Sequence, residues 1–215
     1  RLSITCLFSC KKSKCDFLIA TPPCQGMSLA GKMHENDPRN SLIKYVIKLA
    51  QELQPTNILI ENVPKVLNTY LSHKGEKLKI TDFIKQELEP LGYIVNPVVV
   101  DASDYGTPQS RKRAIYLISK LQKWELPSKK EKITVREMIE YLPTLESEQS
   151  SDIKYHNAKK HNDRHIAFLK KTPTGKTALH NKVHYPKKVD GTRIKGYDTT
   201  YKRIEWDKPS PTITM

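Results

Sequence analysis

Apolar and polar residues follow two different periodicities in the first 120 residues of the chain. Over 40–53 and 77–91, apolar residues recur at helical spacing, and Gly92 marks the end of the second segment. Short apolar runs typical of strands occur at 17–20 and 57–60, and two further runs, rich in Val, Ile and Tyr, occur at 93–101 and 113–119. Strands separated by helices predict an α/β fold with a mostly parallel, three-layer sheet.

The pattern changes beyond Lys120. Thr134-Val135-Arg136-Glu137 matches a capping box and predicts a short helix that runs to Leu142. After this helix, prolines, glycines, histidines and lysines dominate, and no long periodic segment follows. We therefore expect a sheet domain over residues 1–120 and a smaller, loop-rich domain over residues 121–215.

Positive charge is concentrated in this second part. The whole chain carries a formal net charge of +14, and residues 154–204 hold fourteen Lys and Arg against three Asp. Five of the seven histidines lie there as well. Solvated lysine-rich faces would give a similar composition, but concentration in one segment favours a polyanion, whose binding is driven by counterion release. We expect nucleic acid as the partner.

Composition also argues against several classes of protein. The chain has no apolar run long enough to span a bilayer and no signal peptide, which predicts a soluble, cytoplasmic protein without a membrane partner. All four cysteines lie within the first 24 residues, a distribution that does not suit a disulfide framework. Cys6, Cys10 and Cys15 have poor spacing for zinc and lie far from most histidines, so we expect no metal site.

Two strand ends carry groups that can do chemistry. The run Phe17 to Ala20 reads as a short buried strand, and the prolines that follow it deliver Cys24 at its carboxyl end. The second run ends in the same way at Glu61-Asn62-Val63-Pro64. Open α/β sheets bind ligands at these ends. Alone, a cysteine beside prolines is more often a small apolar residue, but a thiol and a carboxylate together suit a nucleophile and a proton donor, with Asn62 positioning them.

A third polar motif lies between the last two strand segments, at residues 105–113. Arg111 and Arg113 alternate, so an extended backbone would project both guanidinium groups to the same side. With the amide of Gln109 they can hold a carboxylate, a phosphate or the edge of a base. A solvated basic loop is the alternative interpretation.

In this order, the three motifs resemble those of the 5-methylcytosine DNA methyltransferases of bacterial restriction-modification systems. Residues 21–28 are similar to the family's Pro-Cys-Gln nucleophile loop, 61–63 to its Glu-Asn-Val motif, and 109–113 to its Gln-x-Arg-x-Arg motif. Residues 37–42 resemble a segment that lines the cofactor pocket, and residues 201–204 and 209–214 resemble the end of bacterial target-recognition regions.

This resemblance implies a Rossmann-like, S-adenosylmethionine-dependent methyltransferase sheet with a small target-recognition domain. Cys24 would add to C6 of a cytosine flipped out of double-stranded DNA, and Glu61 would hydrogen-bond or protonate N3 of the ring. Arg113, with Arg111 near it, would hold the base. The methyl group of S-adenosylmethionine would then be transferred to C5. By the same resemblance, cofactor-binding residues would be Pro23, Asp37 and Leu42, and DNA-binding residues would be Gln25, Ser28, Asn62, Gln109, Arg203, Thr212 and Thr214.

The chain departs from the family pattern at both ends. The family's glycine-rich turn between its first strand and helix is not found, since the first glycine is Gly26. Family members also continue beyond the position of Met215. We therefore expect a sheet that is incomplete at both ends, completed by another methyltransferase chain or by self-association. The alternatives are a catalytically inert DNA-binding or specificity subunit, half of a split methyltransferase, and a tRNA cytosine methyltransferase, whose Cys-Phe-Thr signature is not found here.

Overall fold

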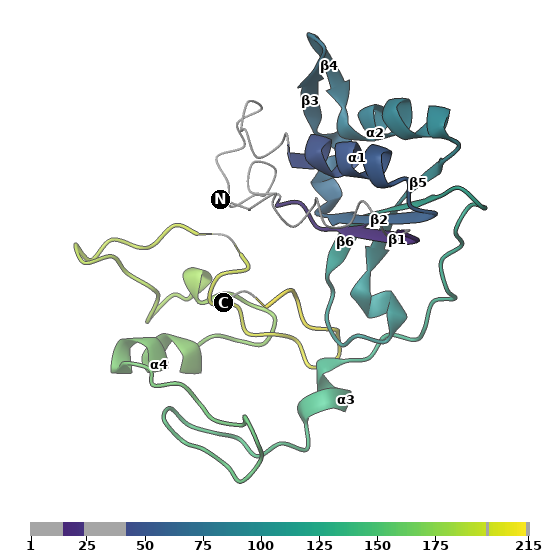
Figure 1. Cartoon of the computed structure of the whole chain (residues 1–215). Helices are drawn as coiled ribbons and strands as arrows, with labels where there is room; N and C mark the ends of the chain where they lie inside the picture. The colour runs from purple at the N-terminus through teal and green to yellow at the C-terminus, as the bar shows by residue number, and fades with distance from the viewer. Residues whose placement is uncertain (1–14, 24–41, 197, 214–215) are drawn as a thin grey trace. The chain divides into compact units, whose positions relative to one another are not determined.

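The computed structural model describes residues 15–23, 42–196 and 198–213 (Figure 1). Two compact units make up the chain. The first comprises Arg1–Asp101 and Lys112–Ser128, and the second comprises Ala102–Arg111 and Lys129–Met215. Within the described part of the chain, no helix is long and apolar enough to cross a membrane.

A four-stranded mixed sheet, in the order β1-β2-β6-β5, forms the centre of the first unit. The strands β1 (Phe17–Ala20) and β2 (Asn57–Asn62) are parallel, whereas β6 (Lys112–Ser119) is antiparallel to both β2 and β5 (Ile94–Asp101). The expectation of a mostly parallel sheet is therefore wrong for the described strands. Residues 102–111 join β5 to β6 through one short 3₁₀ turn, η6 (Ala102–Tyr105), and a connection without a crossover α-helix returns the chain antiparallel.

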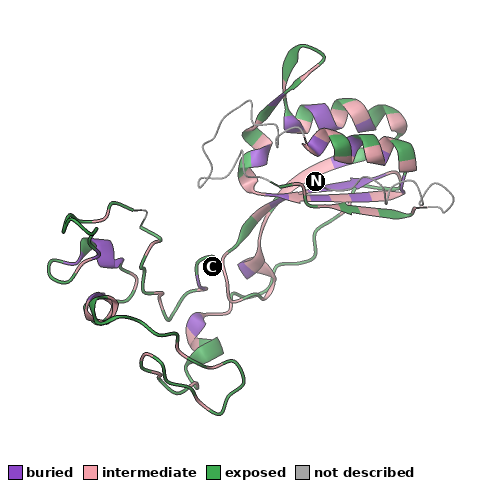
Figure 2. Ribbon diagram, turned by 60° about the vertical axis from the view of Figure 1, so that its left-hand side comes forward, coloured by how far each residue is buried: buried purple, intermediate pink, exposed green. Residues whose placement is uncertain are grey.

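Helices α1 (Leu42–Leu53) and α2 (Ile80–Leu88) both cover the same face of this sheet (Figures 1 and 2). Both β2 and β6 direct alternate side chains into the resulting core, in which Ile60 pairs with Tyr116. The buried Tyr116 hydroxyl lies 2.9 Å from the Thr81 hydroxyl of α2, so its polar end is satisfied inside the core. Apolar side chains of the two helices complete this core: Ile43, Ile47, Ala50, Ile80, Phe83, Ile84 and Leu88.

The segment 77–91 is only partly helical. A hairpin of β3 (Tyr70–His73) and β4 (Glu76–Lys79) precedes α2, and its two-residue turn places Lys74 and Gly75 at φ 50° and 86°. Positive φ at both turn residues suits the twist of a tight hairpin. The expected stop is confirmed, because the chain leaves the 3₁₀ turn η5 (Glu89–Leu91) through Gly92, which has a φ of 84°.

The face of the sheet opposite the helices is partly open. Phe17 and Ile19 of β1 are 44% and 65% exposed, so the expectation of a buried strand is wrong. The reason is its position, since β1 is an edge strand of the described sheet and only its other side chains face the helices. Trp124 covers part of this face by stacking on Phe17, with ring centroids 5.6 Å apart.

The second unit is rich in loops, as expected. Its first helix, α3 (Val135–Ile139), is opened by the predicted capping box, in which the Thr134 hydroxyl accepts from the Glu137 amide and the Glu137 carboxylate accepts from the Thr134 amide. This helix ends before Leu142. The helix α4 (Asp163–Lys170) was not expected, although its N-cap, Asn162, was visible in the sequence. Further 3₁₀ turns are η4 (Pro64–Asn68) in the first unit and η7 (Ala178–His180) in the second.

The two faces of the sheet predict different responses to the same substitution. Ile60→Ala removes a fully buried side chain and should lower the free energy of unfolding by about 2–5 kcal/mol. Ile19→Ala, on the exposed face of the neighbouring strand, should cost less than about 1 kcal/mol. Urea denaturation of both variants measures the difference, and equal losses would contradict the one-sided packing described above.

Candidate active site

The carboxyl ends of β1 and β2 meet because these strands are parallel and in register. Ala20 pairs with Ile60, so Thr21 and Pro22 leave the sheet beside Glu61 and Asn62. The prolines then end the ladder, since each lacks a backbone N–H donor. The parallel pairing therefore brings residues 21–23, the described part of the first motif, to the same edge of the sheet as Glu61 and Asn62.

A buried amide joins these two strand ends. Asn62 is 3% exposed, and its Nδ2 donates to the carbonyl of Pro22 over 3.1 Å. Its Oδ1 accepts from the backbone N–H of Val63 at 2.9 Å. Burying a polar side chain costs little stability when both its donor and its acceptor are hydrogen-bonded, and the bonds fix its orientation. Asn62 therefore fixes the backbone two residues before Cys24.

Glu61 points to the opposite side of β2 and is held by an ion pair. The antiparallel register places Glu61 opposite Ile115. Arg113 is two residues from Ile115 along β6, so its side chain lies on the same face of the sheet as Glu61. The Nε of Arg113 lies 2.7 Å from Oε1 of Glu61, while Nη1 donates to the carbonyl of Lys112 at 2.7 Å. Both side chains stay partly exposed, at 22% for Arg113 and 34% for Glu61.

This geometry leaves the carboxylate able to act on a ligand. Among the described residues, Oε2 of Glu61 has no hydrogen-bond partner, while Oε1 is oriented by the guanidinium. A carboxylate fixed at one oxygen and accessible at the other can donate or accept a proton at a positioned ring atom. The guanidinium supplies positive charge beside it, which can stabilise negative charge that develops on a bound group.

Several predicted site residues lie outside the described part of the chain: Cys24, Gln25, Ser28, Asp37 and Thr214. Of the predicted cofactor residues, Pro23 lies three residues after the end of β1 and is exposed, and Leu42 is half-buried at the start of α1. The structure therefore brings together Glu61, Asn62 and Arg113 with the backbone that leads to Cys24.

The Gln-x-Arg-x-Arg motif divides between the two units. Arg113 belongs to β6 of the first unit, whereas Gln109 and Arg111 belong to the second. There, Ser110 and Ser210 hold two segments together: the Ser110 amide donates to the Ser210 carbonyl at 2.8 Å, and the Ser210 amide donates to the Pro108 carbonyl at 2.9 Å. Sequence reasoning treated these two segments separately and missed their pairing.

Two predicted DNA-binding residues make hydrogen bonds within the second unit. The Thr212 hydroxyl donates to the Ser110 carbonyl at 3.0 Å, which extends the pairing between the two segments. Arg203 donates from Nε to the Thr172 carbonyl at 2.7 Å and from Nη2 to the Leu169 carbonyl at 2.5 Å. Arg203 therefore satisfies carbonyls at the end of α4. DNA contact by either side chain stays a prediction.

Removing the Asn62 amide should destabilise the edge of the sheet that carries the site. Asn62→Ala leaves the Pro22 carbonyl and the Val63 amide without this partner, so the free energy of unfolding should fall by about 1–3 kcal/mol. Asn68→Ala is the matched control, because Asn68 is exposed and its side chain forms no hydrogen bond within the described part of the chain. Thermal unfolding of the two variants measures the effect, and equal melting temperatures would remove the structural role from Asn62.

Comparison with known proteins agrees with this arrangement. Residues 4–215 match the family model for the C-5 cytosine-specific DNA methylases. The chain is 46% identical over 206 residues to the type II methyltransferase M1.HgaI of Avibacterium volantium, covering 93% of this chain and 57% of the relative. It is 31% identical over 208 residues to M1.HphI of Haemophilus parahaemolyticus, covering 94% of this chain and 52% of the relative. The chain thus spans about half the length of the curated relatives it matches.

Solved structures share the fold. A crystal structure of a DNA modification methyltransferase encoded within an E. coli prophage superposes with a TM-score of 0.50 and 25% identity, covering 80% of this chain and 49% of the other. The methyltransferase EhMeth of Entamoeba histolytica superposes with a TM-score of 0.50 and 21% identity, covering 81% and 50%. With the family match across nearly the whole sequence and the geometry at the ends of β1 and β2, these comparisons show that the chain belongs to the C-5 cytosine-specific DNA methylases.

Proposed function

We propose that the chain provides the catalytic centre and the target-binding region of a DNA cytosine-C5 methyltransferase of a restriction-modification system. The observation that carries this proposal is that one residue or more from each of the three motifs, namely Pro22, Glu61, Asn62 and Arg113, lies at one edge of the sheet. The Asn62 amide holds the backbone that leads to Cys24, and the neighbouring Glu61 is oriented by Arg113 at 2.7 Å. A nucleophile, a proton donor and a cation are the groups that activation of a cytosine ring requires.

The proposed reaction begins with the target base turned out of the duplex, because C6 of a stacked cytosine is inaccessible. The thiolate of Cys24 adds to C6, and its electron pair shifts the ring electrons toward C5 and N3. Glu61 hydrogen-bonds or protonates N3, so the negative charge does not remain on the ring. Arg113 keeps the carboxylate in place while C5 becomes nucleophilic.

S-adenosylmethionine would supply an electrophilic methyl group to the activated C5. Pro23 and Leu42 fit its binding as far as they are described, because both leave apolar surface accessible in the first unit. Asp37 is the third proposed cofactor residue. A base then removes the C5 proton, and the electron pair returns to the ring as the bond between Cys24 and C6 breaks. The nucleophile is thereby regenerated.

We assign residues 1–120 to the catalytic domain and residues 121–215 to the target-recognition domain. The two compact units support this division, apart from residues 102–111, which pack with the second unit, and residues 121–128, which pack with the first. The proposed catalytic residues are Cys24, Glu61, Arg111 and Arg113. The proposed DNA contacts are Gln25, Ser28, Asn62, Gln109, Arg203, Thr212 and Thr214. Double-stranded DNA in the cytoplasm is the proposed substrate.

We also propose that a third layer covers the open face of the sheet in the active enzyme. The exposed side chains of Phe17, Ile19 and Ile94 support this, because apolar groups on a sheet face are ordinarily packed. The relatives are about twice as long as this chain, so additional sequence, a complementing methyltransferase chain or a second copy can supply the layer. Size-exclusion chromatography of the chain with and without DNA tests self-association.

Trapping of a covalent intermediate tests the nucleophile. With S-adenosylmethionine and duplex DNA that carries 5-fluorocytosine, the chain should form an adduct that survives denaturing electrophoresis, because fluorine at C5 cannot leave as a proton does. Cys24→Ala should abolish this adduct, whereas Cys15→Ala, nine residues earlier, should retain it. An adduct that survives Cys24→Ala would remove Cys24 from its role. Salt-sensitive DNA binding with no adduct in the parent chain would instead identify an inert DNA-binding subunit.

The proton donor is tested by separating turnover from binding. Glu61→Gln keeps the shape of the side chain but removes its acidity, so methyl transfer should fall about 10²–10⁴-fold while DNA affinity changes little. The control is Glu52→Gln, at an exposed position on α1. Methyl transfer from labelled S-adenosylmethionine and DNA binding are measured on the same preparations. A parallel loss of DNA affinity in Glu61→Gln would assign Glu61 to binding instead.

A further inference from the structure

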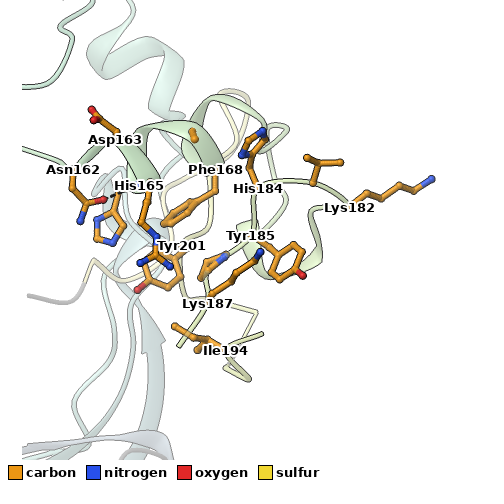
Figure 3. Close-up of a pocket in the computed structure, with 14 residues that line it drawn as sticks. Asn162, Asp163, His165, Phe168, Lys182, His184, Tyr185, Lys187, Ile194 and Tyr201 are labelled. Carbon is orange, nitrogen blue, oxygen red and sulfur yellow. Dashed lines mark hydrogen bonds between the residues drawn. The ribbon is translucent and has the colours of Figure 1, made fainter. Parts of the chain in front are cut away.

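A cavity of about 660 Å³ lies entirely within the second unit (Figure 3). The residues that line it are different from those proposed above for catalysis. One wall is α4 together with Asn162, and the facing wall is the segment Lys182–Lys187 (Figure 3). Tyr201 and Ile194 close the space between these walls. The volume is large enough to hold a nucleotide.

Aromatic rings form one side of this cavity. His165 and Tyr201 each pack on the buried Phe168, with ring centroids 5.2 Å from it. On the facing wall, the ring of Tyr185 carries the guanidinium of Arg193 at 3.6 Å and the ammonium of Lys187 at 4.9 Å. These two cations already lie over the ring of Tyr185. Tyr201 is 37% exposed and has no cation over its ring among the described residues, so it is the ring that can stack on a ligand; Figure 3 shows both rings beside the cavity.

Buried hydrogen bonds hold the two walls at a fixed separation. The side-chain amide of Asn181 donates to the Phe168 carbonyl at 3.1 Å, and it also donates to the His184 carbonyl at 3.2 Å. These carbonyls belong to opposite walls. Arg193 donates to the carbonyls of Leu179 and Asn181, which fixes the guanidinium that supports Tyr185. The cavity is therefore preformed, and a ligand would not have to order it on binding.

The charge around the cavity suits an anion. Arg164, Lys182 and Lys187 line it, whereas Asp163 is the one acid in its lining. Within the described residues, neither Arg164 nor Lys182 has an ion-pair partner, and both are exposed. Free cations around an aromatic surface match the two chemical parts of a nucleotide, a phosphate and a flat ring.

We propose that this cavity binds one unstacked nucleotide of the DNA substrate. Its base would stack against Tyr201, and the flanking phosphates would contact Arg164 and Lys182. A paired and stacked base exposes only its edges, so a ring can stack here only where the helix is opened. An acidic peptide would satisfy the cations but leave the aromatic walls without a flat partner. The proposal rests on the proposed function, because it takes DNA as the substrate.

Photo-crosslinking tests the stacking directly. A short single-stranded oligonucleotide with one 5-iodouracil is bound to the intact chain and irradiated, and the attached peptide is mapped by mass spectrometry. The crosslink should fall on Tyr185, Tyr201 or His165, and a fully paired duplex of the same sequence should give far less. Crosslinks confined to residues outside this cavity, or an equal yield from the paired duplex, would overturn the proposal.

Variants with matched controls test the residues. Tyr201→Leu should weaken binding of the single strand about 5- to 100-fold, the range for loss of one stacked base, while Tyr141→Leu, in the same unit but outside the cavity, should have little effect. Arg164→Gln with Lys182→Gln should weaken binding more than Lys159→Gln with Lys195→Gln, which removes the same charge from exposed positions elsewhere. These charge variants leave Lys187 and Arg193, the cations that lie over the ring of Tyr185, unchanged. If both double variants lost the same affinity for the single strand, binding would depend on the overall positive charge and not on this cavity, which would contradict the proposal.

The outcome is separable from that of the catalytic proposal. Crosslinking needs no methyl transfer, so Cys24→Ala should crosslink as well as the parent chain. An adduct at 5-fluorocytosine without a crosslink in this cavity would overturn the cavity alone. A crosslink in the cavity without an adduct would overturn catalysis by this chain while leaving the nucleotide site in place.

Discussion

The parallel pairing of β1 and β2 is the constraint on which the edge that carries Glu61 and Asn62 depends. Two strands that run in the same direction end at the same edge of a sheet, and only there can the residues after Ala20 lie beside Glu61. Asn62 makes the arrangement rigid by joining the Pro22 carbonyl to the start of the next turn. Because this amide is buried and hydrogen-bonded at both its nitrogen and its oxygen, it links the two strand ends.

The antiparallel strand β6 supplies Arg113, the partner of Glu61. By pairing between β2 and β5, it brings a residue from a distant part of the sequence onto the face that Glu61 occupies. A parallel neighbour with a crossover helix would have placed different residues at this edge. The departure from the expected parallel sheet is thus also the reason that Arg113 can orient the carboxylate.

A second buried asparagine joins separate backbone segments in the second unit, which contains few helices and strands. Asn181 joins two walls of a cavity through backbone carbonyls, as Asn62 joins two strand ends. In both places a side-chain amide makes hydrogen bonds to two backbone groups and so joins the segments that carry them. Loop-rich regions that must keep a defined shape depend on such side-chain bonds, since an unsatisfied buried carbonyl is costly.

The sequence by itself determined the positions of the four strands of the larger sheet, the helix α1, the capping box at Thr134 and the three motifs that indicate the family. These features are local, because strand and helix periodicity, caps and short motifs are written in neighbouring residues. It did not determine the direction of β6, the hairpin before α2, or the exposure of Ile19, which depends on what lies beside an edge strand. Nor could it reveal that Ser110 pairs with Ser210, or that Asn181 and Tyr201 meet α4 across a cavity. Those relations join residues far apart in the chain, and only the tertiary structure decides which distant groups satisfy one another's hydrogen bonds and burial.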